Sequence, residues 1–73
     1  MLVMEYKGWE IEIHSKKAPD THGWRVYVLV SIAAGAAVRT VPLSFRDGRA
    51  FATEDDATAA GVQLAKGWID EQG

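Results

Sequence analysis

Apolar and polar residues alternate along three stretches of the first half of the chain, at residues 9–14, 24–32 and 38–43. A period of two with one apolar face is typical of half-buried β-strands, and the β-branched and aromatic content of residues 24–32 supports this interpretation. Pro42 cannot donate a ladder hydrogen bond, so we expect the third strand at a sheet edge. The positions expected to face the core are Trp9, Ile11, Ile13, Val26, Val28 and Val30.

The segments between these strands have the composition of loops and turns. Residues 15–23 are polar and contain proline and glycine, so they predict a loop. Residues 33–37 (AAGAA) predict a hairpin turn, and residues 44–52 predict a connector with a turn at Asp47-Gly48. Residues 1–6 form either a short extra strand or a lead-in to the first strand.

A capped amphipathic helix is predicted from residue 53 to the end of the chain. Thr53 is a good N-cap with Asp56 at the third helical position, and the helix dipole favours the three acidic side chains of the first turn. Small and large apolar residues recur every three or four positions and form one stripe. That stripe comprises Ala57, Ala60, Gly61, Leu64, Ala65 and Trp68, with Val62 and Ile69 beside it.

One helix cannot bury its own apolar stripe, so the strands must supply the surface that covers it. The sequence therefore predicts a single α+β domain over residues 1–73. We expect a three-stranded antiparallel meander, with the possible short N-terminal strand, and one C-terminal helix packed on one face (βββα).

Composition narrows the setting and the chemistry. The 73 residues include no cysteine and have a formal net charge of −2, so disulfides are excluded and the basic excess usual in nucleic-acid binders is missing. The first residues lack the pattern of a signal peptide, and no apolar run approaches the ~20 residues of a membrane span. We therefore expect a cytoplasmic protein without membrane contact.

No catalytic constellation emerges from the residue pattern. A metal site at His14, Asp20 and His22 is one alternative, but their spacing matches no established signature. Glu10 and Glu12 point the same way from a strand, with no pocket to shift a pKa. We expect no enzyme, no catalytic residue, no metal and no cofactor.

The sheet face opposite the helix is the candidate functional surface. The leading hypothesis is a non-enzymatic interaction module that binds a protein partner or a second copy through this face. Its expected contact residues are Arg25, Tyr27, Leu29, Arg39 and Val41. The alternative is a weak nucleic-acid-binding domain, with contacts at Lys16, Lys17, Arg25 and Arg39.

The segments YKGWEI, GWRVYVLV and FATEDDATAAGVQLAKGWID resemble a family of short bacterial proteins of unknown function. Its shared features are a tryptophan-marked strand pair and a helix that begins FAT and ends WID. The resemblance covers most of the chain and implies a fold and a bacterial cytosolic setting, but no activity, because the matching residues pack and cap. A second resemblance, of architecture alone, is to plant AP2-type and phage integrase arm-type DNA-binding domains, which read DNA with a sheet face.

Overall fold

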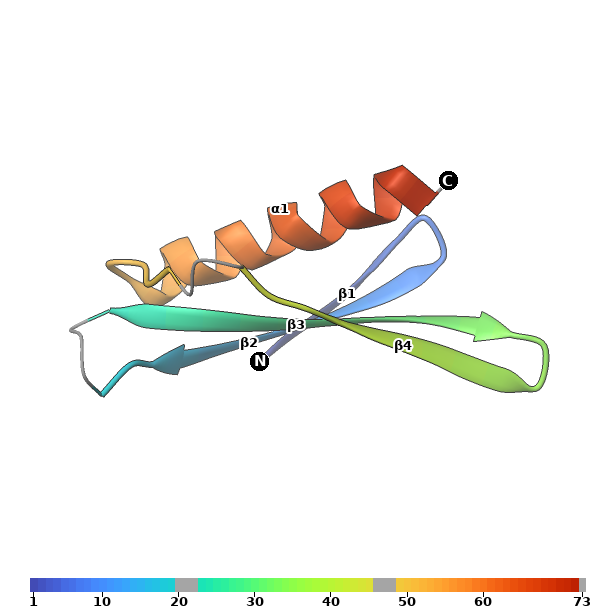
Figure 1. Cartoon of the computed structure of the whole chain (residues 1–73), viewed down its shortest axis with the longest axis horizontal. Helices are drawn as coiled ribbons and strands as arrows, with labels where there is room; N and C mark the ends of the chain where they lie inside the picture. Colours follow the sequence, from blue (N-terminus) through green and yellow to red (C-terminus); the bar gives the residue numbers. More distant parts are fainter. Residues whose placement is uncertain (20–22, 46–48, 73) are drawn as a thin grey trace.

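The computed structural model describes residues 1–19, 23–45 and 49–72, which form a four-stranded antiparallel sheet and one helix (Figure 1). The strands are β1 (Leu2–Tyr6), β2 (Trp9–Lys17), β3 (Trp24–Ala34) and β4 (Ala37–Leu43), and the helix is α1 (Glu54–Gln72). The predicted α+β class, with a C-terminal helix on an antiparallel sheet, is confirmed. The sheet has four strands rather than three, because residues 2–6 form the additional strand β1.

The strands follow one another in the order β1-β2-β3-β4, so each pairs with its neighbour in sequence. The turn between β1 and β2 is Lys7 and Gly8, with φ angles of 51° and 84°. Two successive positive φ angles are typical of a type I′ turn, whose twist matches that of the strands it joins. Tyr6 therefore lies directly opposite Trp9.

The turn between β3 and β4 is shorter than predicted. It consists of Gly35 and Ala36, and Ala34 pairs directly with Ala37. Gly35 has a φ of 66°, and glycine at the first position of a two-residue turn is typical of type II′. The sequence predicted a five-residue turn at 33–37, because alanine carries little strand signal.

Strand β2 is longer than predicted, since it continues to Lys17 and not to His14. Ser15, Lys16 and Lys17 pair with residues of β3. Their polar side chains gave no strand signal in the sequence, although their backbone belongs to the regular ladder. The predicted 15–23 loop thus begins only after Lys17. The predicted turn at Asp47-Gly48 lies outside the described residues.

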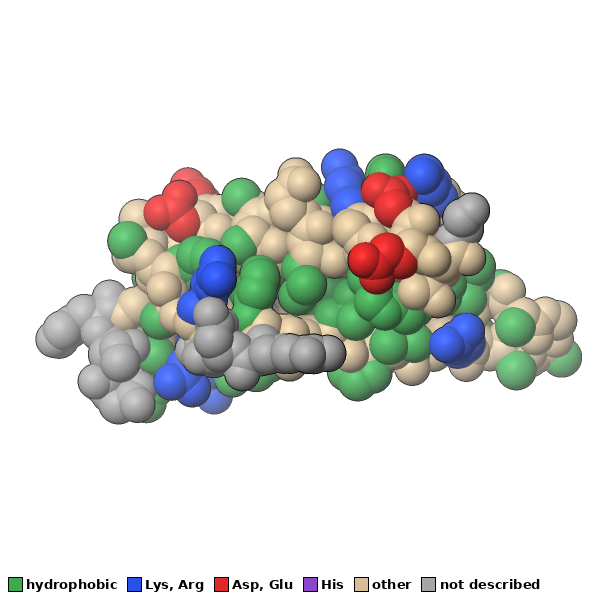
Figure 2. All heavy atoms as spheres, turned by 45° about the horizontal axis from the view of Figure 1, so that its top comes forward, with side chains coloured by type: hydrophobic (Ala, Val, Ile, Leu, Met, Phe, Trp, Pro, Cys, Tyr) green, Lys and Arg blue, Asp and Glu red, His purple; other side chains and the backbone are tan. Residues whose placement is uncertain are grey.

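The helix begins where the sequence predicted. The Asp56 amide donates to Thr53 Oγ1 at 3.0 Å, and the Ala57 amide donates to the Thr53 carbonyl at 3.1 Å. Just before this cap, Phe51 and Trp24 exchange two backbone hydrogen bonds of 2.7 and 2.8 Å, which tie the connector to β3. The first turn of α1 carries Glu54, Asp55 and Asp56, and acidic side chains are seen at this end of the helix, on the left in Figure 2.

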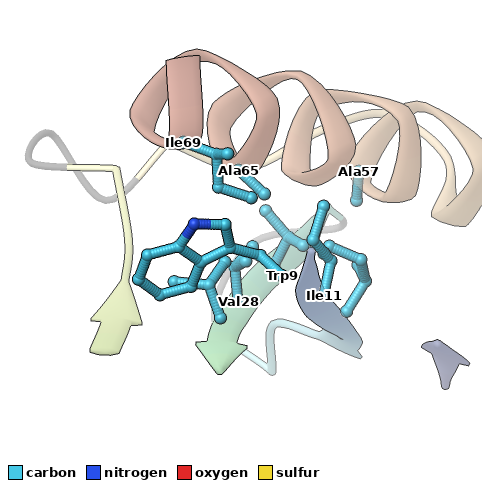
Figure 3. Close-up of a cluster of buried hydrophobic side chains, with 9 residues drawn as sticks. Trp9, Ile11, Val28, Ala57, Ala65 and Ile69 are labelled. Atoms are coloured by element: carbon cyan, nitrogen blue, oxygen red, sulfur yellow. The ribbon is translucent and has the colours of Figure 1, made fainter. Parts of the chain in front are cut away.

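The core lies between α1 and one face of the sheet, and Figure 3 shows part of it. All six sheet positions predicted to face the core are buried. On the helix, the most deeply buried residues differ in part from the predicted stripe. Ile69 is only 2% exposed, whereas Leu64 and Trp68 are half-buried at the border of the core. Trp68 packs edge-on against Trp9, with ring centroids 5.2 Å apart. The buried helix residues are Ala57, Gly61, Ala65 and Ile69.

Gly61 is the point of closest approach between the helix and the sheet. A Cβ atom at this position would lie 2.7 Å from Val26 Cγ2, 3.2 Å from Ile13 Cγ2 and 3.3 Å from Val28 Cγ2. These neighbours are buried and β-branched, so they have little freedom to move away. The absent side chain at Gly61 therefore sets the distance between the two layers.

We predict that Gly61→Ala lowers the free energy of unfolding by about 1–2 kcal/mol, because overpacking outweighs the higher helix propensity of alanine. Gly67→Ala is the matched control, since a Cβ there meets nothing within 4 Å. It should raise stability by up to about 1 kcal/mol. Urea unfolding followed by tryptophan fluorescence measures both, and equal effects of the same sign would contradict the close approach.

Candidate functional site

One face of the sheet, opposite α1, is covered by no helix or strand of the described residues (Figure 1). We call it the open face. Alternation along each strand and the pairing register define its members, none of which is buried. They are Val3, Glu5, Glu10, Glu12, His14, Lys16, Arg25, Tyr27, Leu29, Ser31, Ala33, Val38, Thr40 and Pro42.

Apolar side chains of β1, β3 and β4 surround Glu12 near the centre of the open face. Glu12 pairs across the sheet with Val3 on one side and Leu29 on the other, and Leu29 pairs with Pro42. Tyr27 is 49% exposed and Val3 is 50% exposed. Leu29 is half-buried. An aromatic and an aliphatic side chain thus stand side by side on β3 in contact with solvent.

Two side-chain pairs give the centre a fixed polar pattern. His14 and Glu12 lie on β2 with His14 Nε2 2.6 Å from Glu12 Oε1. Ser31 Oγ and Thr40 Oγ1 are 3.1 Å apart across β3 and β4. The Glu12 carboxylate thus has a hydrogen-bonding partner on its own strand.

The two ends of the open face carry opposite charge. Glu5 and Glu10 lie directly opposite each other on β1 and β2 and form the acidic end. Lys16 and Arg25 lie directly opposite each other on β2 and β3 and form the basic end. Lys16 lies six positions along β2 from Glu10, which corresponds to about 20 Å in an extended strand.

The predicted contact residues divide between the two faces of the sheet. Arg25, Tyr27 and Leu29 lie on the open face as expected, but the placement of Arg39 and Val41 there was wrong. Arg39 pairs with Ile32 and Val41 with Val30, so both share the face that α1 covers. Val41 packs against the core.

The error has one physical cause. A five-residue turn at 33–37 would place Ile32 opposite Val38, whereas the observed two-residue turn places Ile32 opposite Arg39. A shift of one residue sends every side chain of a strand to the other face. The open face of β4 therefore carries Val38, Thr40 and Pro42.

The predicted nucleic-acid contacts do not form one surface. Lys16 and Arg25 are neighbours on the open face. Lys17 pairs with Trp24 and shares the opposite face, and Arg39 lies on that opposite face near the far end of the hairpin. Only two of the four cations can therefore contact the same flat partner.

For the metal hypothesis, Asp20 and His22 lie outside the described residues, so the structure does not place them relative to His14. Within the part of the chain that the structure describes, no group of three or more His, Cys, Asp or Glu side chains is arranged to hold a metal ion. The one helix of these residues, α1, has neither the length of apolar sequence nor the low charge of a membrane span.

A separate cluster joins the β1–β2 turn to the end of α1. Asp70 Oδ1 accepts hydrogen bonds from Lys7 Nζ at 2.7 Å and from the Tyr6 hydroxyl at 2.9 Å. The ammonium groups of Lys7 and Lys66 lie 5.4 and 5.3 Å from the centre of the Tyr6 ring. These hydrogen bonds, that from Lys7 first, lower the pKa of Asp70 below its usual 3.8, and the bond to Asp70 raises the pKa of Tyr6 and of Lys7. These contacts join side chains of the same chain, so we assign the cluster a structural role.

Comparison of the chain with protein-family models, with curated proteins and with solved structures gave no significant match in any of the three. The resemblance to the bacterial family therefore stays a prediction. The candidate site rests on geometry alone.

The sequence analysis missed Val3, Glu5, Ala33, Val38, Thr40 and Pro42 as members of the open face. The β1 residues were missed because residues 1–6 were left as either a short extra strand or a lead-in, and the turn at Lys7 and Gly8 was not used as evidence. A positive-φ dipeptide flanked by alternating residues is a hairpin signal and would have placed β1 beside β2. The β4 residues were missed through the turn length.

We predict that Asp70→Asn causes a small drop in the midpoint of thermal unfolding near neutral pH. A carboxyl whose pKa is lowered on folding contributes stability above its unfolded pKa, and that stability is lost as pH falls through the folded value. The difference between Asp70→Asn and the parent should therefore narrow below about pH 4. Glu71→Gln, on the same exposed helical turn, is the control and should not lower the midpoint. A pH-independent difference would show that the Asp70 charge is not involved.

Proposed function

We propose that this chain is a non-enzymatic protein-interaction module that binds its partner through the open face. The observation that carries the proposal is the exposed apolar centre at Tyr27 and Leu29, set between an acidic and a basic end on an uncovered sheet. The proposal keeps the bacterial cytoplasmic setting that the family resemblance implies, and it invokes no cofactor.

The open face carries an exposed aromatic side chain, whereas a solvated sheet face usually carries polar ones. Antiparallel sheets can present one solvated face, and polar side chains are then expected at most of its positions. Here a tyrosine that is 49% exposed lies on β3, one of the two central strands of the sheet. Tyrosine is enriched at interfaces because a rigid ring adds contact area at low entropic cost, while a charged rim provides specificity.

Nucleic-acid binding has less support than protein binding. The four basic residues expected to contact phosphates divide between the two faces of the sheet. The acidic end places Glu5 and Glu10 on the face that would approach the backbone of the nucleic acid. With a formal net charge of −2, the chain has no overall attraction for phosphates to offset this repulsion.

We predict that a photoreactive benzoylphenylalanine at position 27 gives a covalent adduct of discrete mass when the chain is irradiated in its native cells. The same group at position 63 is the control, because Gln63 is exposed on the side of α1 that faces away from the sheet. Adding Leu29→Glu should abolish the adduct at position 27, because a charge would then lie in the apolar centre. No adduct at position 27, or equal adducts at both positions, would contradict the proposal.

A further inference from the structure

The two outer strands of the sheet differ in how their free edges are protected. Within the described residues, β1 and β4 each pair with a strand on one side only. Such an edge presents a row of unpaired N–H and C=O groups, which proteins usually protect with proline, lysine or a bulge. β4 contains Pro42, whereas β1 (LVMEY) has no proline, no lysine and an unbroken register. The edge of β1 is therefore the one open to a further strand.

The pairing register shows which backbone groups of β1 point outward. The Ala18 amide donates to the Gly23 carbonyl at 2.9 Å, in continuation of the register of β2 and β3. Because hydrogen-bonded positions alternate along an antiparallel pair, even-numbered residues of β2 bond to β3 and odd-numbered ones bond to β1. The N–H and C=O groups of Val3 and Glu5 consequently point away from the sheet. The β1 residues that bond to β2 are Leu2, Met4 and Tyr6.

The same alternation explains the position of Pro42 on the other edge. Even-numbered residues of β3 bond to β4, so their partners on β4 are odd-numbered and the even-numbered residues of β4 point outward. Pro42 therefore replaces an outward N–H group by a ring, as proline on an edge strand does. The sheet thus has one blocked edge and one open edge.

The open edge also carries exposed apolar side chains. Met1, Leu2 and Val3 are 81%, 41% and 50% exposed. Leu2 lies on the helix side of the sheet, because it pairs with the buried Ile13. Met4 follows it in the same row and packs against the core. The apolar core therefore reaches the edge at β1 and ends there in solvent.

We propose that β1 pairs in antiparallel orientation with β1 of a second copy of this chain, about a two-fold axis perpendicular to the sheet. The axis passes between the two Met4 residues, and the two sheets become one continuous sheet. Val3 then lies opposite the partner's Glu5, and these residues exchange their outward backbone hydrogen bonds. This edge is separate from the apolar side chains of Tyr27 and Leu29, so the inference goes beyond the proposed function.

The side chains match in this arrangement. An axis perpendicular to the sheet keeps its two sides apart, so both helices lie on the same side. On that side Leu2 lies opposite the partner's Tyr6, and Met4 lies opposite the partner's Met4. Directly opposed side chains of an antiparallel pair are about 4.5–5.5 Å apart at Cβ and pack on each other. The exposed Leu2 thereby becomes buried, and the two cores join.

The register follows from charge and length. Two other two-fold registers bring the outward groups together, one centred on Val3 and one centred on Glu5. The axis at Glu5 would place this carboxylate directly opposite its own copy, and like charges in that position destabilise a sheet. The axis at Val3 would pair only residues 2–4 of the strand. The axis at Met4 pairs all of β1, Leu2–Tyr6.

Closure of the assembly favours a two-fold pair over other strand pairings between copies. Pairing of β1 with the partner's β4 would be head-to-tail, which leaves a free β1 at the end of every assembly and forms filaments. It would also bring the outward groups of β1 against Pro42, which has no N–H to donate. The two-fold pair uses both open edges and leaves only the two blocked ones in solvent.

Disulfide formation by single introduced cysteines tests the register, because the chain has no cysteine of its own. Met4 would form a non-hydrogen-bonded pair with its copy, with Cα atoms about 4.5 Å apart, which suits a disulfide. Met4→Cys should therefore form a covalent dimer with oxidised glutathione about tenfold faster than Val3→Cys or Glu5→Cys, whose copies lie two residues out of register, roughly 8 Å apart. Val38→Cys, on the edge of β4, is the control for random collision. Non-reducing electrophoresis measures all four.

Sedimentation velocity, from micromolar to submillimolar concentration, tests the hydrogen bonds of the edge. The parent should form a dimer. Val3→Pro removes an outward donor but no bond to β2, and by symmetry it removes two bonds from the dimer, so the dissociation constant should rise about tenfold or more. Val38→Pro is the matched control on the edge of β4 and should change the constant less than twofold. Circular dichroism establishes that each variant is folded.

Four results would overturn the inference. A parent that is monomeric at the highest concentration, with Met4→Cys oxidised no faster than Val38→Cys, excludes the second copy. Fastest oxidation of Val3→Cys or Glu5→Cys shows that the axis is not at Met4. A dimer weakened by Val38→Pro but not by Val3→Pro associates through β4. A dimer weakened only by Tyr27→Glu associates through the open face, as the proposed function allows, and not through the edge of β1.

Discussion

The contact of Gly61 with Val26 and Ile13 sets the position of the helix, and the rest of the structure depends on it. Without a side chain at this point, the helix backbone lies directly on the β-branched layer of the sheet. Ala57 and Ala65, one turn to either side, are fully buried and keep the approach close. A larger residue at any of the three would move the helix away and open the core beside it.

This close approach also decides which surfaces remain available. A helix pressed onto β2 and β3 covers one side of the sheet, and its contacts are mostly with these two strands. The other side needs no cover for folding, because its side chains are mostly polar and its backbone is paired. The open face is thus free to carry charges and an exposed Tyr27 that the stability of the chain does not require.

The features that the sequence predicted correctly are those that depend on residues close together along the chain. The Thr53 cap, the helix and the inward phase of β2 and β3 follow from local spacing, and all are present. The centre of the helical stripe was shifted toward Ile69, because packing against a twisted sheet chooses among several apolar positions of similar hydrophobicity. The phase of β4 depends on the length of a turn, which alanine-rich sequence does not reveal.

That single turn decides the electrostatics of the open face. With a five-residue turn, Arg39 would have paired with Ser31 and lain on the open face, across β3 from Glu10. In the observed register Thr40 faces Ser31, and Arg39 lies on the helix side. The open face of β4 therefore carries a hydroxyl group, and not a cation, beside Ser31. A two-residue turn of glycine and alanine thus keeps Arg39 away from the surface that is proposed to bind a partner.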